Sequence, residues 1–287
     1  MLKLSEFMTI GGHVSTAGGI PLAVGRAESF GFNTFQIFSK NQMQWKARPL
    51  PTEESEEFRS LRERAGMKNI MVHASYLLNM GTSDGDLRIK VLEAFREEIR
   101  RTDDLGIEYL TFHPGSSGKM DRKTAISNVS ANLNSVIGEK QACMILLETS
   151  AGQGNTVGST FEELAEMIDG IDSKNKVGIC FDTCHVWASG YDIRTPEGYQ
   201  ETMDQFKSTI GMERLKGFHL NDSKKDRGSK LDRHEQIGLG TLGLQGIGNF
   251  VLDRRFKDLP MILETPRGED GYQDDLDQIQ RIVEQRA

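Results

Sequence analysis

Eight short, strongly apolar runs recur along this chain, and their regular spacing limits the folds that it can adopt. Their mean spacing is about 36 residues, and they begin near residues 9, 34, 70, 109, 144, 177, 215 and 261. Such runs are typical of parallel strands buried on both faces. Longer polar segments with helical periodicity lie between them. The alternation predicts an α/β fold, a (β/α)8 TIM barrel, with a doubly wound sheet as the alternative.

The helical pattern is clearest in the segments 52–66 and 86–106. Gly66 and Gly106 stand where glycine commonly ends a helix. In the second segment, apolar residues at i, i+3, i+6 and i+10 predict one buried stripe. We expect that stripe to consist of Ile89, Leu92, Phe95 and Ile99.

The chain reads as one domain, because no linker divides its 287 residues. We expect a single barrel domain over 1–287, with 1–7 as an N-terminal lead-in. No apolar run is long enough to cross a membrane, and the first residues lack the features of a signal peptide. Three cysteines do not suit a disulfide scaffold. A reduced compartment is predicted: the cytoplasm of a bacterium or archaeon, or a eukaryotic nucleus.

Histidine and acidic residues stand at or just past the ends of the apolar runs. A barrel brings these carboxyl-terminal ends to one face, where active sites are built. None of the six histidines falls in a segment predicted to be an outer helix. The residues at the predicted strand ends are His13, His73, His113, Glu148, Asp182, His219 and Glu264, and His185, Asp232 and His234 lie close by in sequence.

These residue types are the ligands that zinc and similar divalent ions prefer. Any one of them alone is more often a hydrogen-bonded structural residue. Nine on one rim, four of them acidic, would repel one another without a counter-charge. In Asp232-Arg-His234, the spacing of two favours one shared ion, and in Asp182-Thr-Cys-His185, the spacing of three lets the side chains diverge. More ligands than one tetrahedral site needs predict a metal cluster.

Two further features are assigned no role in this chemistry. Cys184 adjoins His185, but it lies near Cys180 in an apolar run and is interpreted as structural. The glycine-rich segment 151–158 lacks the lysine and the spacing of a phosphate-binding loop. It is interpreted as a barrel loop.

The sequence strongly resembles endonuclease IV, the zinc-dependent apurinic/apyrimidinic endonuclease family of DNA base-excision repair. The resemblance runs from Gly11 almost to the C-terminus. The ordered blocks that carry it are GGHVSTAGG (11–19), NQMQW (41–45), HASYLLN (73–79), FHPGS (112–116), LETSAGQG (147–154), DTCH (182–185), GYDIRT (190–195), FHLNDSK (218–224), DRH (232–234) and ILET (262–265).

The resemblance implies three zinc ions per chain on a TIM barrel. His73, His113 and Glu148 would hold the first ion. Glu148 would bridge to the second, which Asp182, His219 and Glu264 complete. His185, Asp232 and His234 would hold the third. His13 and Asn221 would then act around these ligands rather than bind metal themselves.

The implied reaction is hydrolysis of the phosphodiester 5′ to an abasic site in duplex DNA. It leaves a 3′-hydroxyl and a 5′-deoxyribose phosphate, and the family also implies cleaning of blocked 3′ ends. A water activated by metal would attack phosphorus, with Glu148 as the catalytic residue that orients it. A monomer is implied.

Loop residues that enter the minor groove are implied to hold the abasic nucleotide out of the stack. The residues expected to contact DNA are Met43, Gln44, Trp45, Tyr76, Leu77, Lys224 and Arg233. The family often has arginine at the position of Met43 and an acid at that of Leu239.

The formal net charge of −7 by itself argues weakly against a nucleic-acid partner. Its distribution points the other way, since lysine and arginine gather in predicted strand-to-helix loops. Those residues are Lys40, Lys46, Arg48, Lys119, Arg122, Lys123, Lys224, Lys225, Arg227, Lys230 and Arg233.

Two other functions fit the same fold. A sugar isomerase or epimerase also binds one or two divalent ions through Glu, Asp and His. It needs no third set of ligands and has no use for the NQMQW loop. A non-catalytic protein that binds damaged DNA would not need all nine metal-binding positions.

Overall fold

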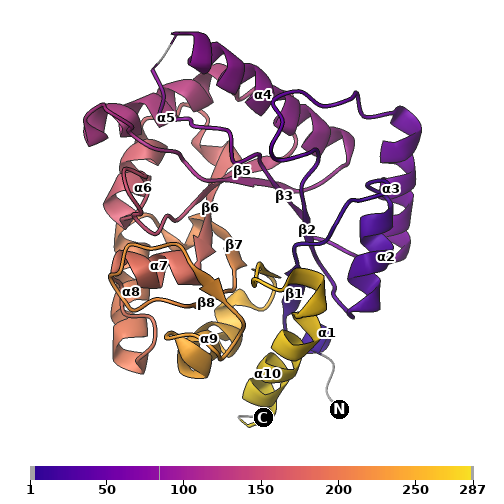
Figure 1. Ribbon diagram of the computed structural model, residues 1–287, viewed down its shortest axis with the longest axis vertical. Helices are drawn as coiled ribbons and strands as arrows, with labels where there is room; N and C mark the ends of the chain where they lie inside the picture. The colour runs from indigo at the N-terminus through magenta and orange to yellow at the C-terminus, as the bar shows by residue number, and fades with distance from the viewer. Residues whose placement is uncertain (1–3, 84, 286–287) are drawn as a thin grey trace.

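Eight parallel strands surround the centre of the molecule, and helices surround the strands in turn (Figure 1). The computed structural model describes residues 4–83 and 85–285. Around the barrel the strand order is β1-β10-β7-β6-β5-β4-β3-β2. These strands are β1 (Thr9–Gly12), β2 (Gln36–Ile37), β3 (Met71–His73), β4 (Tyr109–Phe112), β5 (Met144–Glu148), β6 (Val177–Asp182), β7 (Leu215–His219) and β10 (Pro260–Leu263).

The sheet closes between its first two strands. An isolated parallel bridge joins His13 to Gln36, and Val14 N donates to the carbonyl of Gln36 at 2.9 Å. On the other side of β1, Thr9 pairs with Pro260 of β10. The (β/α)8 barrel predicted from the spacing is therefore confirmed, and the doubly wound alternative is wrong. All eight strands begin within two residues of the predicted positions.

The helices lie in the intervals between the apolar runs, as predicted. Glycines at positive φ follow α3 and α4 at positions 66 and 106. The α-helices are α1 (Leu4–Phe7), α2 (Leu22–Ser29), α3 (Thr52–Arg64), α4 (Gly85–Asp104), α5 (Arg122–Val136), α6 (Phe161–Asp169), α7 (Thr183–Ser189), α8 (Pro196–Thr209), α9 (Gly243–Val251) and α10 (Tyr272–Glu284). Short 3-10 turns cover Lys174–Lys176, Met212–Arg214, Arg254–Phe256 and Gly268–Asp270.

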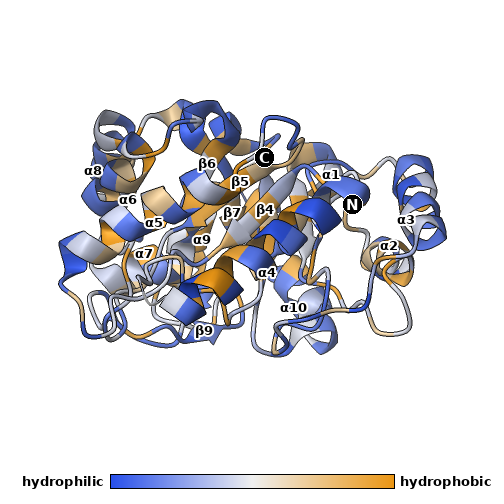
Figure 2. Ribbon diagram, turned by 90° about the horizontal axis from the view of Figure 1, so that it is seen from above, coloured by the Kyte–Doolittle hydropathy of each residue, from blue (hydrophilic) through white to orange (hydrophobic). Residues whose placement is uncertain are grey.

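The hydrophobic core lies between the strands and the helices. Figure 2 shows the apolar strands inside and hydrophilic residues on the outer faces of the helices. In α4, Leu92, Phe95 and Ile99 are buried as predicted, but Ile89 is 55% exposed. At about 100° per residue, Ile89 lies on the side of the helix away from Val91 and Glu98, both buried. The spacing of six residues between Ile89 and Phe95 therefore does not place both side chains on the buried face of α4.

The predicted lead-in over 1–7 is only partly visible, since 4–7 form α1 and 1–3 lie outside the described residues. None of the described helices is long and apolar enough to cross a membrane. A two-stranded antiparallel ribbon, β8 (Asp222–Ser223) with β9 (His234–Glu235), was not predicted. It holds the segment 224–233 after β7, at the mouth of the barrel.

Candidate metal centre

The nine predicted ligands lie together at the carboxyl-terminal mouth of the barrel. Four of them end strands, and two follow the strands β4 and β10 directly. The remaining three come from α7 and from the ribbon with its loop. Their ligand atoms form three sets, with every atom within 4.8 Å of the others in its set. The sets are His73, His113 and Glu148; Glu148, Asp182, His219 and Glu264; and His185, Asp232 and His234.

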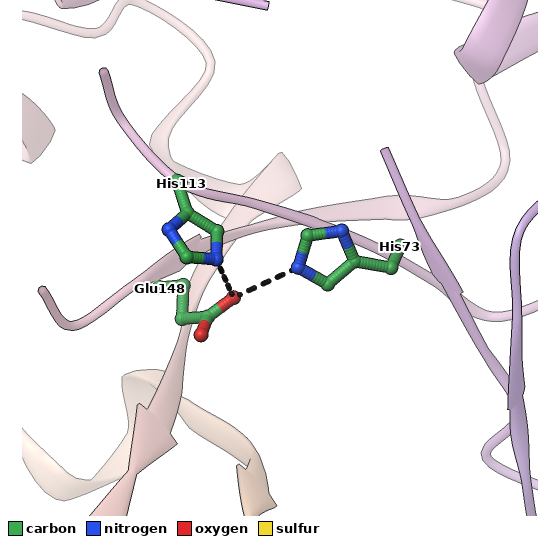
Figure 3. Close-up of side chains that lie close together, drawn as sticks. All are labelled: His73, His113 and Glu148. Atoms are coloured by element: carbon green, nitrogen blue, oxygen red, sulfur yellow. Dashed lines mark ion pairs between the residues drawn. The ribbon is translucent and has the colours of Figure 1, made fainter. Parts of the chain in front are cut away.

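Glu148 belongs to two of these sets and is completely buried. Its Oε2 atom lies 3.3 Å from His73 Nε2 and 3.5 Å from His113 Nε2, and both rings point at this oxygen in Figure 3. Its Oε1 atom faces the other way and lies 3.1 Å from His219 Nδ1. One carboxylate is thus placed between two potential cation positions.

Asp182 and His185 direct their side chains to different sets. The prediction placed both residues at a strand end, whereas α7 begins at Thr183, so His185 is helical. Asp182 caps this helix, because its Oδ1 accepts from His185 N at 2.7 Å. Its Oδ2 accepts from Asn221 Nδ2 at 2.8 Å, while Asn221 Oδ1 accepts from Glu264 N at 2.9 Å. Asn221 therefore orients two predicted ligands from outside the sets.

Three of the histidines are held in one tautomer by the main chain. Nδ1 of His73, His185 and His234 lies 2.7, 2.8 and 3.0 Å from the carbonyl oxygens of Ala74, Thr149 and Glu264. A carbonyl only accepts hydrogen bonds, so Nδ1 carries the proton. In the neutral ring, Nε2 then presents a lone pair to the set. Metal-binding histidines are commonly fixed in this way.

Three carboxylates of the centre have pKa values that neighbouring histidines lower. Burial by itself raises the pKa of Glu148, but the charges of His113 and His219 outweigh it and lower the pKa well below its usual range. Histidine neighbours also overcome burial to lower the pKa values of Asp232 and Glu264.

Several acceptor atoms in these sets are buried and face one another. Three that lack a hydrogen-bond partner are Glu148 Oε2, His185 Nε2 and His234 Nε2. Acceptors that are buried and unsatisfied are costly, and a divalent cation is their natural partner. The residues present therefore fit a metal cluster.

Cys184 is also close to this centre. Its sulfur lies within 4.8 Å of ligand atoms of Asp182 and His234, although its interpretation from sequence was structural. Burial raises the pKa of its thiol to about 12. Since thiolate is the form that binds metal, the thiol is a weaker candidate than the histidines and carboxylates.

His13 belongs to none of the sets. Its Nδ1 lies 3.0 Å from Gln36 Nε2 and 3.5 Å from Glu264 Oε1, and its ring packs 4.3 Å from that of Phe38. This placement agrees with the expectation that His13 acts beside the ligands. Gln36 was not singled out by sequence reasoning, although a polar residue inside the apolar run 35–38 was the available signal.

The loops predicted to contact DNA flank the centre. Met43 is 66% exposed and Tyr76 is 58% exposed, with the Tyr76 ring 5.3 Å from that of His73. A cavity of about 240 Å³ is lined by His73, Tyr76 and His113 among others. The other predicted contacts are exposed or half-buried, namely Gln44, Trp45, Leu77, Lys224 and Arg233.

The predicted basic loops are less free than their sequence indicates. Lys40 is buried and pairs with Glu98. Arg48, Arg122 and Arg227 lie in ion pairs with acidic residues. Three of the acidic partners, Glu54, Glu98 and Glu163, lie on the helices α3, α4 and α6 rather than in the loops. The rim is therefore less positive than predicted.

Asp222 organises the segment that carries Asp232 and His234. It is completely buried and accepts from the main-chain nitrogens of Ser223, Gly238, Gly240 and Gly243 at 2.7–3.0 Å. A Cβ atom at Gly240 would lie 2.3 Å from Asp222 Oδ1, so the glycine is required there. The spacing of these residues gave no sign of this role.

Comparisons with known proteins agree with this architecture. A model of the xylose isomerase-like TIM-barrel family matches residues 24–282. A D-tagatose 3-epimerase-like protein of known structure superposes with a TM-score of 0.72 at 20% identity, covering 97% of this chain and 99% of that one, which shows the shared fold. The chain is therefore a member of the xylose isomerase-like TIM barrels.

Nearer relatives define the family within this class. A protein from Thermoplasma acidophilum described as probable endonuclease 4 is 46% identical over 274 residues, covering 96% of this chain and 94% of the relative. The crystal structure of endonuclease IV from Thermus thermophilus superposes with a TM-score of 0.85 at 35% identity, covering 96% and 99% of the two chains. The chain belongs to the endonuclease IV family.

Proposed function

We propose that this protein is a zinc-dependent endonuclease of DNA base-excision repair. It hydrolyses the phosphodiester 5′ to an abasic site in duplex DNA and leaves a 3′-hydroxyl and a 5′-deoxyribose phosphate. It also removes blocking groups from 3′ ends. It acts as a monomer in the cytoplasm of a bacterium or archaeon, or in a eukaryotic nucleus. Family membership, with relatives described as endonuclease 4, supports the nuclease assignment.

The observation that carries the proposal is the division of nine ligands into three sets that share Glu148. One zinc ion is assigned to His73, His113 and Glu148. A second is assigned to the set that adds Asp182, His219 and Glu264 to Glu148. The third is assigned to His185, Asp232 and His234. Each set offers the three or four nitrogen and oxygen donors that zinc takes in proteins.

Zinc ions at such positions lower the pKa of water and neutralise charge that develops on a phosphoryl group. Glu148 is the catalytic residue of the chain. Its two oxygens face different sets, so this carboxylate would keep the two metal positions at a constant separation. Asn221 holds the carboxylate of Asp182 by a 2.8 Å hydrogen bond. Burial of these side chains excludes competing water. No side chain is required as general acid if the leaving oxygen is stabilised by charge.

The exposed loop residues supply the DNA contacts. Met43 and Tyr76 are large and exposed, and the ring of Tyr76 packs against that of His73, so they can occupy the space of a missing base and keep the nucleotide out of the stack. Gln44, Trp45 and Leu77 complete this surface. Lys224 and Arg233 are exposed near the ribbon and can contact phosphates.

A sugar isomerase or epimerase is the alternative on the same barrel. Likeness to an epimerase-like protein at 20% identity concerns the fold alone. The set of His185, Asp232 and His234 favours the nuclease, because isomerases need no third set of ligands. The exposed residues of the 41–45 loop favour it as well.

A duplex that contains one tetrahydrofuran abasic analogue tests the proposal. The analogue cannot undergo β-elimination, so any cleavage is hydrolytic. We expect incision on its 5′ side with an extendable 3′-hydroxyl, and loss of incision after preincubation with a zinc chelator. Metal analysis of the same sample should give three zinc ions per chain. No incision by protein that contains three metal ions would overturn the nuclease assignment.

A further inference from the structure

Gln36 is a polar side chain in an apolar strand, completely buried inside the barrel beneath the metal centre. Its amide makes three contacts. Nε2 donates to Glu264 Oε1 at 2.6 Å and lies 3.0 Å from His13 Nδ1. Oε1 lies 2.9 Å from His219 Nε2. A buried amide without hydrogen-bond partners is unfavourable, so these contacts account for its presence.

The chemistry of the partners fixes the orientation of the amide. An ionised carboxylate has only acceptors, so the amide nitrogen must face Glu264. The amide oxygen then faces His219. Because that oxygen only accepts, His219 Nε2 must carry the proton.

In the neutral ring of His219, which is the form that binds a metal ion, Nδ1 is then the unprotonated nitrogen. Nδ1 lies 3.1 Å from Glu148 Oε1, 3.2 Å from Glu264 Oε2 and 3.9 Å from Asp182 Oδ2. With the ring in this form, four acceptors from four residues converge. That arrangement is favourable only around a cation.

His219 differs in this respect from other histidines of the centre. His73, His185 and His234 present Nε2, because a main-chain carbonyl holds each Nδ1. His219 presents Nδ1, and a side chain holds its Nε2. A side-chain partner can be removed by substitution, whereas a carbonyl cannot.

We propose that Gln36 is a positioning residue that selects the Nε2–H tautomer of His219 and aligns Glu264, so that their acceptors meet on one divalent ion. The inference rests on the proposed metal-dependent function and deepens it. Gln36 also lies where β1 and β2 close the barrel, so its main chain cannot shift easily. The fold fixes the position of the amide, and the amide in turn fixes the orientation of His219 and Glu264.

Two variants separate the role of the amide from that of its bulk. Gln36→Met keeps the size and removes all three polar contacts. Gln36→Glu keeps an acceptor for His219 Nε2 but opposes Glu264. A control, Gln141→Met, changes the same residue type before β5, at the opposite end of the barrel, where its amide contacts only the carbonyl of Cys143.

The first measurement is zinc affinity, by competition with a chromophoric chelator and by metal analysis after dialysis. For Gln36→Met we expect one of three zinc ions to bind about 10–100-fold more weakly, as for other partners of metal ligands. Gln141→Met should keep all three. If all three zinc ions bind to Gln36→Met as tightly as to the parent protein, the inference is overturned.

The second measurement is long-range proton–nitrogen NMR of the histidine rings in the purified protein. We expect His219 to show a protonated Nε2 in the parent protein and in Gln36→Glu, and to lose that preference in Gln36→Met. A parent protein with protonated Nδ1 at His219 would overturn the inference. If zinc binds as expected but DNA is not cut, the proposed nuclease function fails while the role of Gln36 stands.

Discussion

Lys40 and Glu98 form an ion pair in which both side chains are almost completely buried, with Nζ 3.3 Å from Oε1. Lys40 Nζ also donates to the main-chain carbonyl of Gln44 at 3.3 Å. Glu98 Oε1 accepts from Ser75 N at 3.2 Å. The pair thus connects helix α4 to two of the loops that we expect to contact DNA, those that carry Gln44 and Tyr76. Both loops are thus held in place by an ion pair whose carboxylate, Glu98, lies on α4 and belongs to neither loop.

Loss of this pair should disorder the DNA-binding surface more than the metal centre. For Glu98→Gln we expect roughly 10-fold weaker binding of abasic duplex, because the loops lose preorganisation, with a smaller change in the rate of incision of bound DNA. Binding titrations and single-turnover incision separate the two effects. Acrylamide quenching of the half-buried Trp45 should increase.

A matched control is Asp104→Asn, which weakens an exposed pair with Arg100 on the same helix. Exposed pairs contribute about 0–1 kcal/mol, so DNA binding should not change. Removal of one partner of a buried pair costs about 3–5 kcal/mol, so the stability of Glu98→Gln is measured alongside. Equal DNA affinity of folded Glu98→Gln and the parent protein would contradict the role of the pair.

Replacement of Glu148 by glutamine tests the shared carboxylate. Glu148→Gln keeps the shape but removes a negative charge and one of two oxygens. We expect incision to fall at least ~10²–10³-fold, as when a group that stabilises a transition state is lost. The measurement is single-turnover cleavage of the tetrahydrofuran duplex by protein with known metal content. Near-normal incision by a metal-loaded variant would show that Glu148 is dispensable.

Met43 replaces the arginine often found at this position in the family. Met43→Arg adds a cation to an exposed site in the loop predicted to contact DNA, so we expect tighter duplex binding. One further phosphate contact should steepen the dependence of log affinity on log salt by about 0.9. Ile89→Arg, at an exposed position on the outer helix α4, is the control and should leave the slope unchanged. The same affinity for Met43→Arg at every salt concentration would argue against this contact.

Glu163 should make stability depend on pH. Burial raises the pKa of Glu163, but the hydrogen bonds and charge of Arg122, with donation from Ser159 N and Gly158 N, outweigh it and lower the pKa. A lowered pKa in the folded state means that the stabilisation is complete above the unfolded pKa, about 4.3. It is lost as pH falls through the folded value.

Chemical denaturation of Glu163→Gln measures this contribution. At pH 7 we expect a loss of about 1–3 kcal/mol in the free energy of unfolding, as for hydrogen bonds to charged groups. The difference from the parent should shrink below about pH 4. Glu162→Gln, an exposed neighbour on α6, should change little. A difference for Glu163→Gln that stays constant down to pH 2 would disprove an ionised Glu163 as its source.

Much of the centre could be predicted because its residues are marked locally. Each of His73, Glu148, Asp182 and His219 ends an apolar run, and a parallel barrel places all such ends on one face. The sets formed by these residues also match those that the family resemblance implies. Local pattern failed where a side chain has an unforeseen partner. The local sequence around Lys40 predicts a basic residue in an exposed loop. In the structure Lys40 is buried in an ion pair with Glu98, 58 positions later.

The sequence by itself determined the eight strands, the helices between them and the residue types at the barrel mouth, because periodicity and strand ends are local properties. Tertiary structure decided which acceptors lie together, which nitrogen of His219 faces the centre, and that Gln36 and Asp222 hold candidate ligands or loops in place. Those outcomes depend on barrel closure. Closure sets distances between residues more than 180 positions apart, such as Gln36 and His219. Distances of that kind follow from the packing of the whole barrel rather than from any single segment.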